Sequence, residues 1–222
     1  NVVRFYRELL ELEQLNTFEP LADVFPTWTA TLRDEILAET ERFIEATVFE
    51  HNGTLRTLLT SRWVEAGPEL SALYGIEVGN NELPVERAGL LTRAGFLATK
   101  SHKTQPSPVF RGLSILNRFL CRQIGAPPPD IPDVTPDVET QTNRERYAAH
   151  SSDPACAGCH RQIDPLGFTL EEFDAIGAYR THDNGHRVDA TDEVLGETVT
   201  GGAELSALLA ENEEVEACAT TQ

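Results

Sequence analysis

The chain contains no methionine, and only four of its 222 residues are cysteines. No apolar run approaches the roughly 20 residues of a membrane-spanning helix, so we expect no direct membrane span. Lysine and arginine are absent beyond Arg187, where acidic residues accumulate, and the formal charge is −18. Phosphate groups repel such a chain, which argues against nucleic acids and anionic membranes as partners. The acidic residues form either a solvated face or a contact for a basic protein partner.

What is present indicates a folded, largely helical protein. Hydrophobic residues make up 40% of the sequence, enough for a core. The segments that carry a predicted helix are 1–15, 27–51, 52–63, 67–76, 106–125, 140–150 and 203–222. Because a helix begins directly at Asn1, which is not Met, and the last helix has no cap, we expect both ends to be internal to a longer polypeptide.

Two further segments interrupt the helices. Residues 126–136, APPPDIPDVTP, predict an extended proline-rich connector on the surface, because proline removes hydrogen-bond donors and fixes the backbone. Asp183-Asn184-Gly185 predicts the turn of a small hairpin. The expected fold class is therefore mainly α with one minor β hairpin.

One short motif carries chemistry: Cys156-Ala157-Gly158-Cys159-His160. A c-type haem is attached by two thiols that add to its vinyl groups, and the histidine after the second cysteine supplies an axial nitrogen. The two-residue spacer matches the vinyl separation. The motif therefore predicts one haem c, covalently bound through Cys156 and Cys159, with His160 as the proximal iron ligand.

Three other interpretations of the motif stay open. A zinc site needs four ligands, yet Cys121 and Cys218 stand alone and only His182 with His186 forms a second pair. A thioredoxin-like thiol pair needs a preceding strand, whereas a predicted helix precedes and "IDPLGF" is expected to form a turn. Two buried, inert cysteines remain the third interpretation.

The sixth iron ligand is constrained by composition. Without methionine, His/Met ligation is not available from this chain. The sixth ligand is therefore another histidine, an unusual donor or a partner's residue, or the sixth position is open. His102 lies in an irregular stretch from which a loop can present a ligand. His150 precedes Cys156 by six positions. We favour His102 over His150 as the second metal ligand beside His160.

These residues together resemble a known family, the planctomycete-type secreted cytochromes. The resemblance rests on "RAGLLTRAGFLATKSHKTQPSPVFRG" and "RERYAAHSSDPACAGCHRQIDPLGFTLEEFDAIGAYR", which contain both candidate histidines and the haem motif. Pro106 stands where the family more often has Thr. The resemblance implies a helical, cytochrome c-like haem domain packed with an N-terminal helical region. It divides the chain into 1–86, part of a preceding domain, 87–194, the haem domain, and 195–222, the start of a helical C-terminal domain.

The haem interpretation suggests roles for further residues. A backbone carbonyl near Asp164-Pro165 is expected to accept the ring N–H of His160. Arg111 or Arg161 is expected to pair with the haem propionates. Because haem attachment requires export to an oxidising compartment, we expect a disulfide between Cys121 and Cys218, with two buried thiols as the alternative.

The function expected from the sequence is that of an exported, extracytoplasmic c-type cytochrome. It carries one bis-histidine haem and transfers electrons with a basic or haem-bearing redox partner. The alternative is a haem enzyme, peroxidase-like or oxygenase-like, with an open or exchangeable sixth position. A module in which haem only stabilises the fold is a third possibility.

Overall fold

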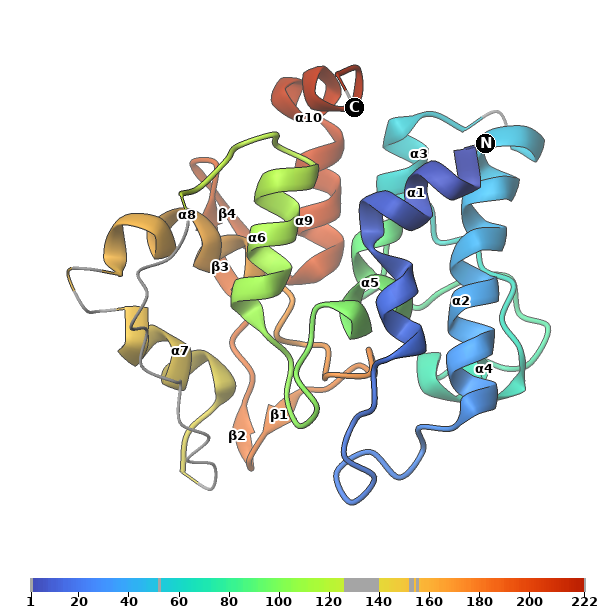
Figure 1. The fold of residues 1–222 in the computed structure, drawn as a ribbon, viewed down its shortest axis with the longest axis horizontal. Helices are drawn as coiled ribbons and strands as arrows, with labels where there is room; N and C mark the ends of the chain where they lie inside the picture. The colour runs from blue at the N-terminus through green and yellow to red at the C-terminus, as the bar shows by residue number, and fades with distance from the viewer. Residues whose placement is uncertain (1, 52, 126–139, 152–153, 155, 222) are drawn as a thin grey trace.

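The computed structural model describes residues 2–51, 53–125, 140–151, 154 and 156–221, and Figure 1 shows how they are arranged. The elements of the first hundred residues lie mostly on one side of the molecule. They are α1 (Val2–Leu10), the 3-10 helix η1 (Leu12–Asn16), α2 (Ala30–Glu45), the π-helix η2 (Ala46–Glu50), α3 (Leu55–Thr60), α4 (Pro68–Tyr74), the 3-10 helix η3 (Leu90–Thr92) and α5 (Ala94–Thr99).

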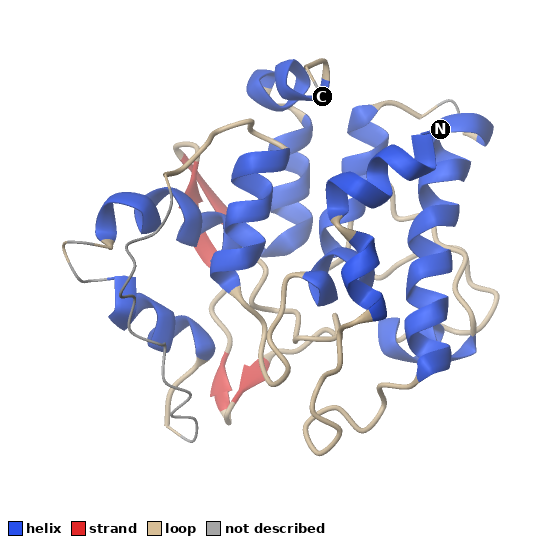
Figure 2. Cartoon of the chain, viewed as in Figure 1, coloured by secondary structure: helices blue, strands red, loops and turns tan. Residues whose placement is uncertain are grey.

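The later elements form the other side and contain the described strands. They are α6 (Pro108–Arg118), α7 (Asn143–Ser151), α8 (Ala157–Phe168), β1 (His182–Asp183), β2 (His186–Arg187), β3 (Thr191–Val194), β4 (Glu197–Thr200), α9 (Gly201–Ala210) and α10 (Glu213–Ala219). In the described part of the chain the fold is mainly α, as predicted, with two antiparallel two-stranded sheets (Figure 2). None of the helices described is long and apolar enough to cross a membrane.

Local sequence signals fix where several helices begin and end. The Thr54 hydroxyl accepts the backbone N–H of Thr57 in a capping box at the start of α3, as expected for an N-cap. Pro68 opens α4, and Gly75 closes it with a φ of 70°. Ser107 caps α6 by accepting from Phe110 N at 3.2 Å. The signals at Thr54, Pro68 and Gly75 made α3 and α4 recognisable in the sequence, whereas the Ser107 cap was not predicted.

Four sequence predictions about boundaries were wrong. The helix predicted over 1–15 is divided at Glu11, whose φ of 56° separates α1 from η1. Helix α6 ends at Arg118 and not at Gly125, because Cys121 adopts a left-handed φ of 51° and turns the chain away. The segment 203–222 is divided into α9 and α10 by Asn212, whose side chain caps the second helix. The "IDPLGF" segment is not a turn but the second half of α8, despite Pro165 inside the helix. The predicted connector 126–136 lies outside the described residues.

One strand pair was not predicted. Strands β3 and β4 are joined by Leu195 and Gly196, both with positive φ, which is the geometry of a tight hairpin turn. Leucine is rare at such a position, so the sequence offered no turn signal there. The predicted hairpin, β1 with β2 around Asn184-Gly185, is confirmed.

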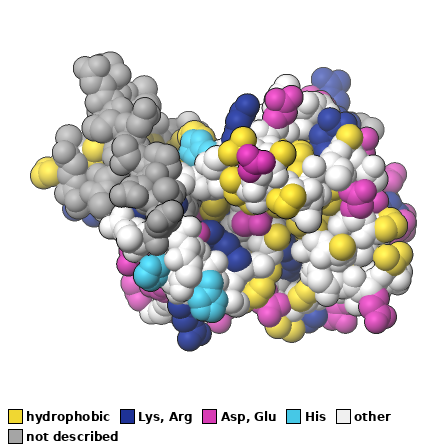
Figure 3. All heavy atoms as spheres, turned by 90° about the horizontal axis from the view of Figure 1, so that it is seen from below, with side chains coloured by type: hydrophobic (Ala, Val, Ile, Leu, Met, Phe, Trp, Pro, Cys, Tyr) yellow, Lys and Arg dark blue, Asp and Glu magenta, His cyan; other side chains and the backbone are white. Residues whose placement is uncertain are grey.

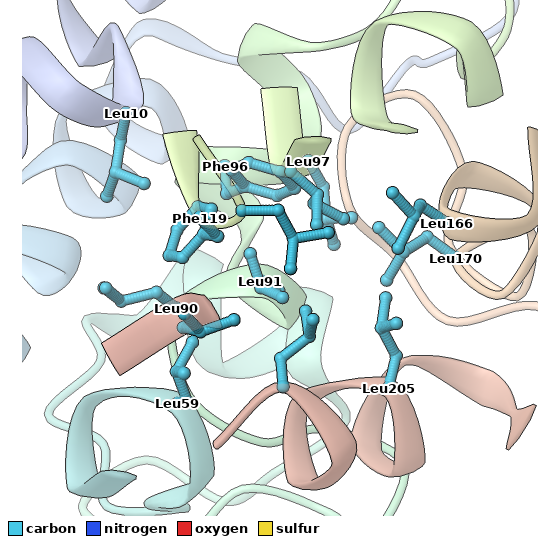
Figure 4. Packing of buried hydrophobic residues seen from close by; sticks show 14 of the residues in the cluster. Leu10, Leu59, Leu90, Leu91, Phe96, Leu97, Phe119, Leu166, Leu170 and Leu205 are labelled. Atoms are coloured by element: carbon cyan, nitrogen blue, oxygen red, sulfur yellow. The ribbon is translucent and has the colours of Figure 1, made fainter. Parts of the chain in front are cut away.

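A single hydrophobic cluster connects both sides of the molecule. Leu10 of α1, Leu97 of α5, Leu166 of α8 and Leu205 of α9 all belong to it, and Figure 4 shows them converging on Leu91. The three segments separated in the sequence analysis therefore share one core. This core holds α8, which carries the cysteine motif, in a fixed position.

Helices α6 and α8 pack closely because two glycines lie at their contact. A Cβ at Gly112 would overlap the carbonyl oxygen of Ile163, and a Cβ at Gly167 would overlap the carbonyl oxygen of Pro108. The reciprocal contacts show that the helices are antiparallel. The packing against α6 explains why the segment around Pro165 stays helical, because Ile163, Leu166 and Phe168 are all buried there.

Candidate functional site

The cysteine motif forms the first turn of α8. Cys156 is the N-cap residue, and its carbonyl accepts the backbone N–H groups of Cys159 and His160, each at 3.2 Å. Neither motif cysteine is in a disulfide; Cys156 is half-buried and Cys159 is exposed. Residues three and four apart lie on one helix face, so both thiols and His160 share a face. This arrangement fits a covalently attached haem, since two accessible thiols stand beside an imidazole.

The imidazole of His160 is held by two side chains. Its Nδ1 lies 2.8 Å from Oδ1 of Asp164, one helical turn further along α8, and 3.1 Å from the Ser151 hydroxyl at the end of α7. Ser151 also donates a short hydrogen bond to Oδ2 of Asp164. The His160 and Asp164 side chains are 14% and 9% exposed. The ring is thus fixed from two helices.

This network differs from the sequence prediction, which gave the His160 ring N–H a backbone carbonyl near Asp164-Pro165. The structure places the Asp164 carboxylate there instead, and it adds Ser151, which the sequence analysis missed. The signal for Asp164 was present, because a histidine and an aspartate four residues apart meet only in a helix. Reading the segment as a turn concealed that pair.

Serine, histidine and aspartate in contact invite comparison with a nucleophile triad. In such a triad the histidine uses one ring nitrogen for the aspartate and the other for the serine. Here Ser151 and Asp164 both approach Nδ1 of His160. The histidine is therefore not placed to activate the serine, and the network positions the ring.

His102 lies in the loop between α5 and α6. The residue is exposed as a whole, and its ring packs 5.1 Å from the ring of Phe110, measured between centroids. Nearby protein atoms remove water from one side of the ring and so lower the pKa of His102. A lowered pKa favours the neutral imidazole, which is the form that binds a metal.

Helix α7 contacts both the His102 loop and the His160 network. At its first turn the Asn143 amide donates to the Pro106 carbonyl at 3.2 Å, and Arg146 donates to the Gln105 side chain at 3.0 Å. At its other end Ser151 meets His160. His150 belongs to the last turn of α7, but its side chain is outside the described atoms, so its role stays a prediction.

Arg111 is placed away from the motif surface. It is 0% exposed, and its guanidinium donates to the carbonyls of Leu170, Phe173 and Asp174 at 2.6–2.9 Å. Burial lowers the pKa of Arg111 to about 10. Its hydrogen bonds tie the segment after α8 to α6, which is a structural role. Of the two predicted propionate partners, Arg161 is the exposed one and follows His160 directly.

Of two cavities in the described part of the chain, one lies beside the motif helix, and neither is lined by Cys156 or Cys159. One of about 150 Å³ is lined by Arg161, Pro165 and Leu195, between α8 and the tip of the β3–β4 hairpin. Another of about 380 Å³ lies between η1, α5 and α6 and includes Lys100 and Phe110. In Figure 3 the histidines visible from below, in cyan, lie toward the left of the view, while acidic and basic side chains are mixed over the right half.

The alternatives for the cysteines fit this geometry less well. No three His, Cys, Asp or Glu side chains gather around one point among the residues the structure describes. His182 and His186 are in the hairpin whose Asp183 caps the first turn of α7. The capped residue, Asn143, is eight residues from Ser151, roughly 12 Å along the helix, so this hairpin meets the end of α7 opposite to the one that contacts His160. A thioredoxin-like pair requires a strand before the motif, whereas the helix α7 precedes it here.

The remaining cysteines form the predicted disulfide. The Sγ atoms of Cys121 and Cys218 are 2.07 Å apart, with Cα atoms 5.4 Å apart. The bond joins the chain just after α6 to α10. It leaves Cys156 and Cys159 as the thiols available to a ligand.

Family models match two parts of the chain. The model PSCyt3, described as "Protein of unknown function (DUF1588)", matches residues 87–183, which include the cysteine motif and His102. The model PSD4, described as "Protein of unknown function (DUF1592)", matches residues 1–76. Both are consistent with the planctomycete-type cytochromes that the sequence resembles. No curated protein and no solved structure matches the chain.

Proposed function

We propose that this chain is the haem-bearing part of an exported c-type cytochrome that transfers single electrons. The observation that carries the proposal is the first turn of α8, where two thiols outside any disulfide share a face with an imidazole fixed by Asp164. The similarity to PSCyt3 over residues 87–183 supports it. A haem c bound there supplies a one-electron redox couple.

Each residue has a distinct task in this proposal. The thiols of Cys156 and Cys159 bond the haem covalently, and Nε2 of His160 is the proximal ligand. Arg161 pairs with a propionate from the exposed side of α8. His102 is the distal ligand, since its loop is joined through α7 to the proximal side and partial burial favours its neutral form. The formal charge of −18 favours a basic redox partner.

The test begins with the full chain produced with export and haem attachment. Acid-acetone extraction should leave the haem on the protein, and the oxidised spectrum should be low-spin. Cys156→Ser with Cys159→Ser should remove covalent haem completely. The matched control is Cys121→Ser with Cys218→Ser, which breaks the disulfide and keeps the haem. Protein that never holds haem covalently would overturn the proposal.

The distal ligand is tested separately. His102→Ala should convert the low-spin spectrum to high-spin, while His150→Ala should leave it low-spin. The reverse result would assign the sixth position to His150. A high-spin spectrum in the unaltered chain that changes with cyanide would contradict the electron carrier and support the haem enzyme.

A further inference from the structure

We propose that Asp164 is the positioning residue of His160: its carboxylate fixes the ring with the proton on Nδ1, and Ser151 of α7 holds that carboxylate in place. The effect on a haem rests on the proposed function, whereas the effect on the ring itself does not. Nothing in the family descriptions assigns a role to either residue.

Counting hydrogens gives the tautomer. A carboxylate only accepts, so the proton between Nδ1 and Oδ1 of Asp164 belongs to His160. The serine hydroxyl has one hydrogen, which goes to Oδ2 of Asp164 or to the Tyr147 carbonyl at 2.9 Å, and in either case none is left for Nδ1. Ser151 therefore meets Nδ1 with a lone pair, as an acceptor, at 3.1 Å. Both contacts require a proton on Nδ1, which leaves the lone pair of a neutral ring on Nε2.

The acceptor's charge has a consequence for the ligand atom. A hydrogen bond to an ionised acceptor is about twice as strong as one to a neutral carbonyl. It draws the Nδ1 proton outward and makes Nε2 a stronger electron donor. A stronger donor stabilises the oxidised state of a bound iron. Asp164 therefore lowers the reduction potential relative to the backbone carbonyl that the sequence predicted.

The position of α7 becomes part of this control. Ser151 is its last residue, and the helix is held at its first turn by the buried Glu171, whose carboxylate accepts from Asn143 at 2.9 Å. Arg144 also packs over the Phe168 ring of α8 at 4.6 Å. Displacing α7 would remove the Ser151 hydroxyl from both Asp164 and the His160 ring, while the contact between Asp164 and His160 within α8 stays. The proximal ligand thus senses whether α7 is docked.

The first experiment needs no haem. In the full chain made without haem attachment, ¹⁵N shifts of the His160 ring report the two tautomers. The proton should lie on Nδ1, and Asp164→Ala should lower the ratio of Nδ1–H to Nε2–H about tenfold. Ser151→Ala should move it in the same direction by less, while Ser151→Thr, which keeps the hydroxyl, should restore it. An unchanged tautomer in Asp164→Ala would overturn the proposal.

The second experiment uses the haem-loaded chain. Asp164→Asn keeps the shape of the side chain and removes its charge, so reduction should become at least about tenfold more favourable, a shift of about 59 mV for one electron. Asp34→Asn makes the same charge change at a side chain 68% exposed on α2. It should change the equilibrium constant for reduction less than about twofold. Equal shifts in the two variants would show that only net charge acts and would overturn the proposal.

The two readouts separate the two claims. If no haem is ever attached but the tautomer responds to Asp164 and Ser151, the proposed function fails and the positioning role stands. If haem is attached and neither the tautomer nor the potential responds, the positioning role fails alone. A near-native circular dichroism spectrum of each variant excludes unfolding as the cause of a shift.

Discussion

The two halves of the molecule each contain a tightly packed ionisable pair, and the pairs are built differently. In the first half, Arg93 and Glu39 are sealed, with side chains 0% and 1% exposed. The Arg93 guanidinium also donates to the Trp63 carbonyl at 2.7 Å and lies over the Phe43 ring. All the contacts described for this pair lie within the interior, so the pair serves the fold.

The pair in the second half has an outward side. His160 and Asp164 are only partly exposed, but the helix turn that carries His160 also presents Cys156 and Cys159. Only one ring nitrogen of His160 is used by Asp164 and Ser151. If the proposed function holds, depth of burial does not identify the functional pair, since the more deeply buried pair is the structural one. The feature that distinguishes the candidate haem site is the two thiols, Cys156 and Cys159, next to the fixed His160–Asp164 pair.

The largest expected effect comes from breaking the sealed pair. Arg93→Met should lower the free energy of unfolding by about 3–5 kcal/mol, because Glu39 would remain buried without its guanidinium. Urea unfolding measures this. In the haem-free chain His160→Ala should cost only about 1 kcal/mol, since Asp164 keeps the Ser151 hydroxyl.

A double variant sharpens this prediction. Arg93→Met combined with Glu39→Leu removes both charges and should recover most of the stability lost in the single variant. A double variant no more stable than Arg93→Met would mean that packing around Phe43, and not an unpaired charge, explains the loss.

A smaller effect is expected where α8 is fixed to α6. Gly167→Ala places a methyl group against the Pro108 carbonyl and should destabilise the chain by about 1–3 kcal/mol. Gly158→Ala, in the same helix, meets no described atom within 4 Å and should be neutral or stabilising by up to about 1 kcal/mol. Thermal unfolding of the haem-free variants compares them. Equal melting temperatures would show that the helices do not require a close approach at Gly167.

The sequence predicted the parts of this molecule that depend on local signals. Helix starts at Thr54 and Pro68, the Asn184-Gly185 turn and the mainly α fold class all follow from caps, turn residues and periodicity. The motif cysteines and His160 were recognisable from spacing alone. The Cys121–Cys218 disulfide followed from the redox environment expected of an exported haem protein.

What the sequence did not predict depends on tertiary contacts. Pro165 and Gly167 look like a turn locally, but packing against α6 keeps them helical. Arg111 was expected as one of two candidate partners of the haem propionates, but the structure buries it among backbone carbonyls from the segment after α8. Ser151 could not be selected, because its function requires the end of α7 to lie beside α8. Such contacts join residues that local patterns treat separately.

The smallest effect concerns a carboxylate between the two halves, Glu172, which accepts the Gly202 N–H at 2.8 Å. The pKa of Glu172 is raised to about 7, mainly by burial and also by Glu86 and Glu204, against the lowering effects of the Gly202 N–H and Arg87. Above its unfolded pKa near 4.5 the folded chain binds the extra proton, so its stability should fall as the pH rises toward 7.

Glu172→Gln keeps an acceptor for Gly202 and removes the titration. Between pH 5 and 7 the unaltered chain should therefore lose about 1–2 kcal/mol more stability than this variant, measured by urea unfolding at each pH. Glu213→Gln makes the same charge change at an exposed position of α10 and should follow the unaltered chain. Parallel curves for all three proteins would place the Glu172 carboxylate in water. Glu172 would then be an ordinary surface acid, in contrast to Glu39, whose buried carboxylate is paired with Arg93.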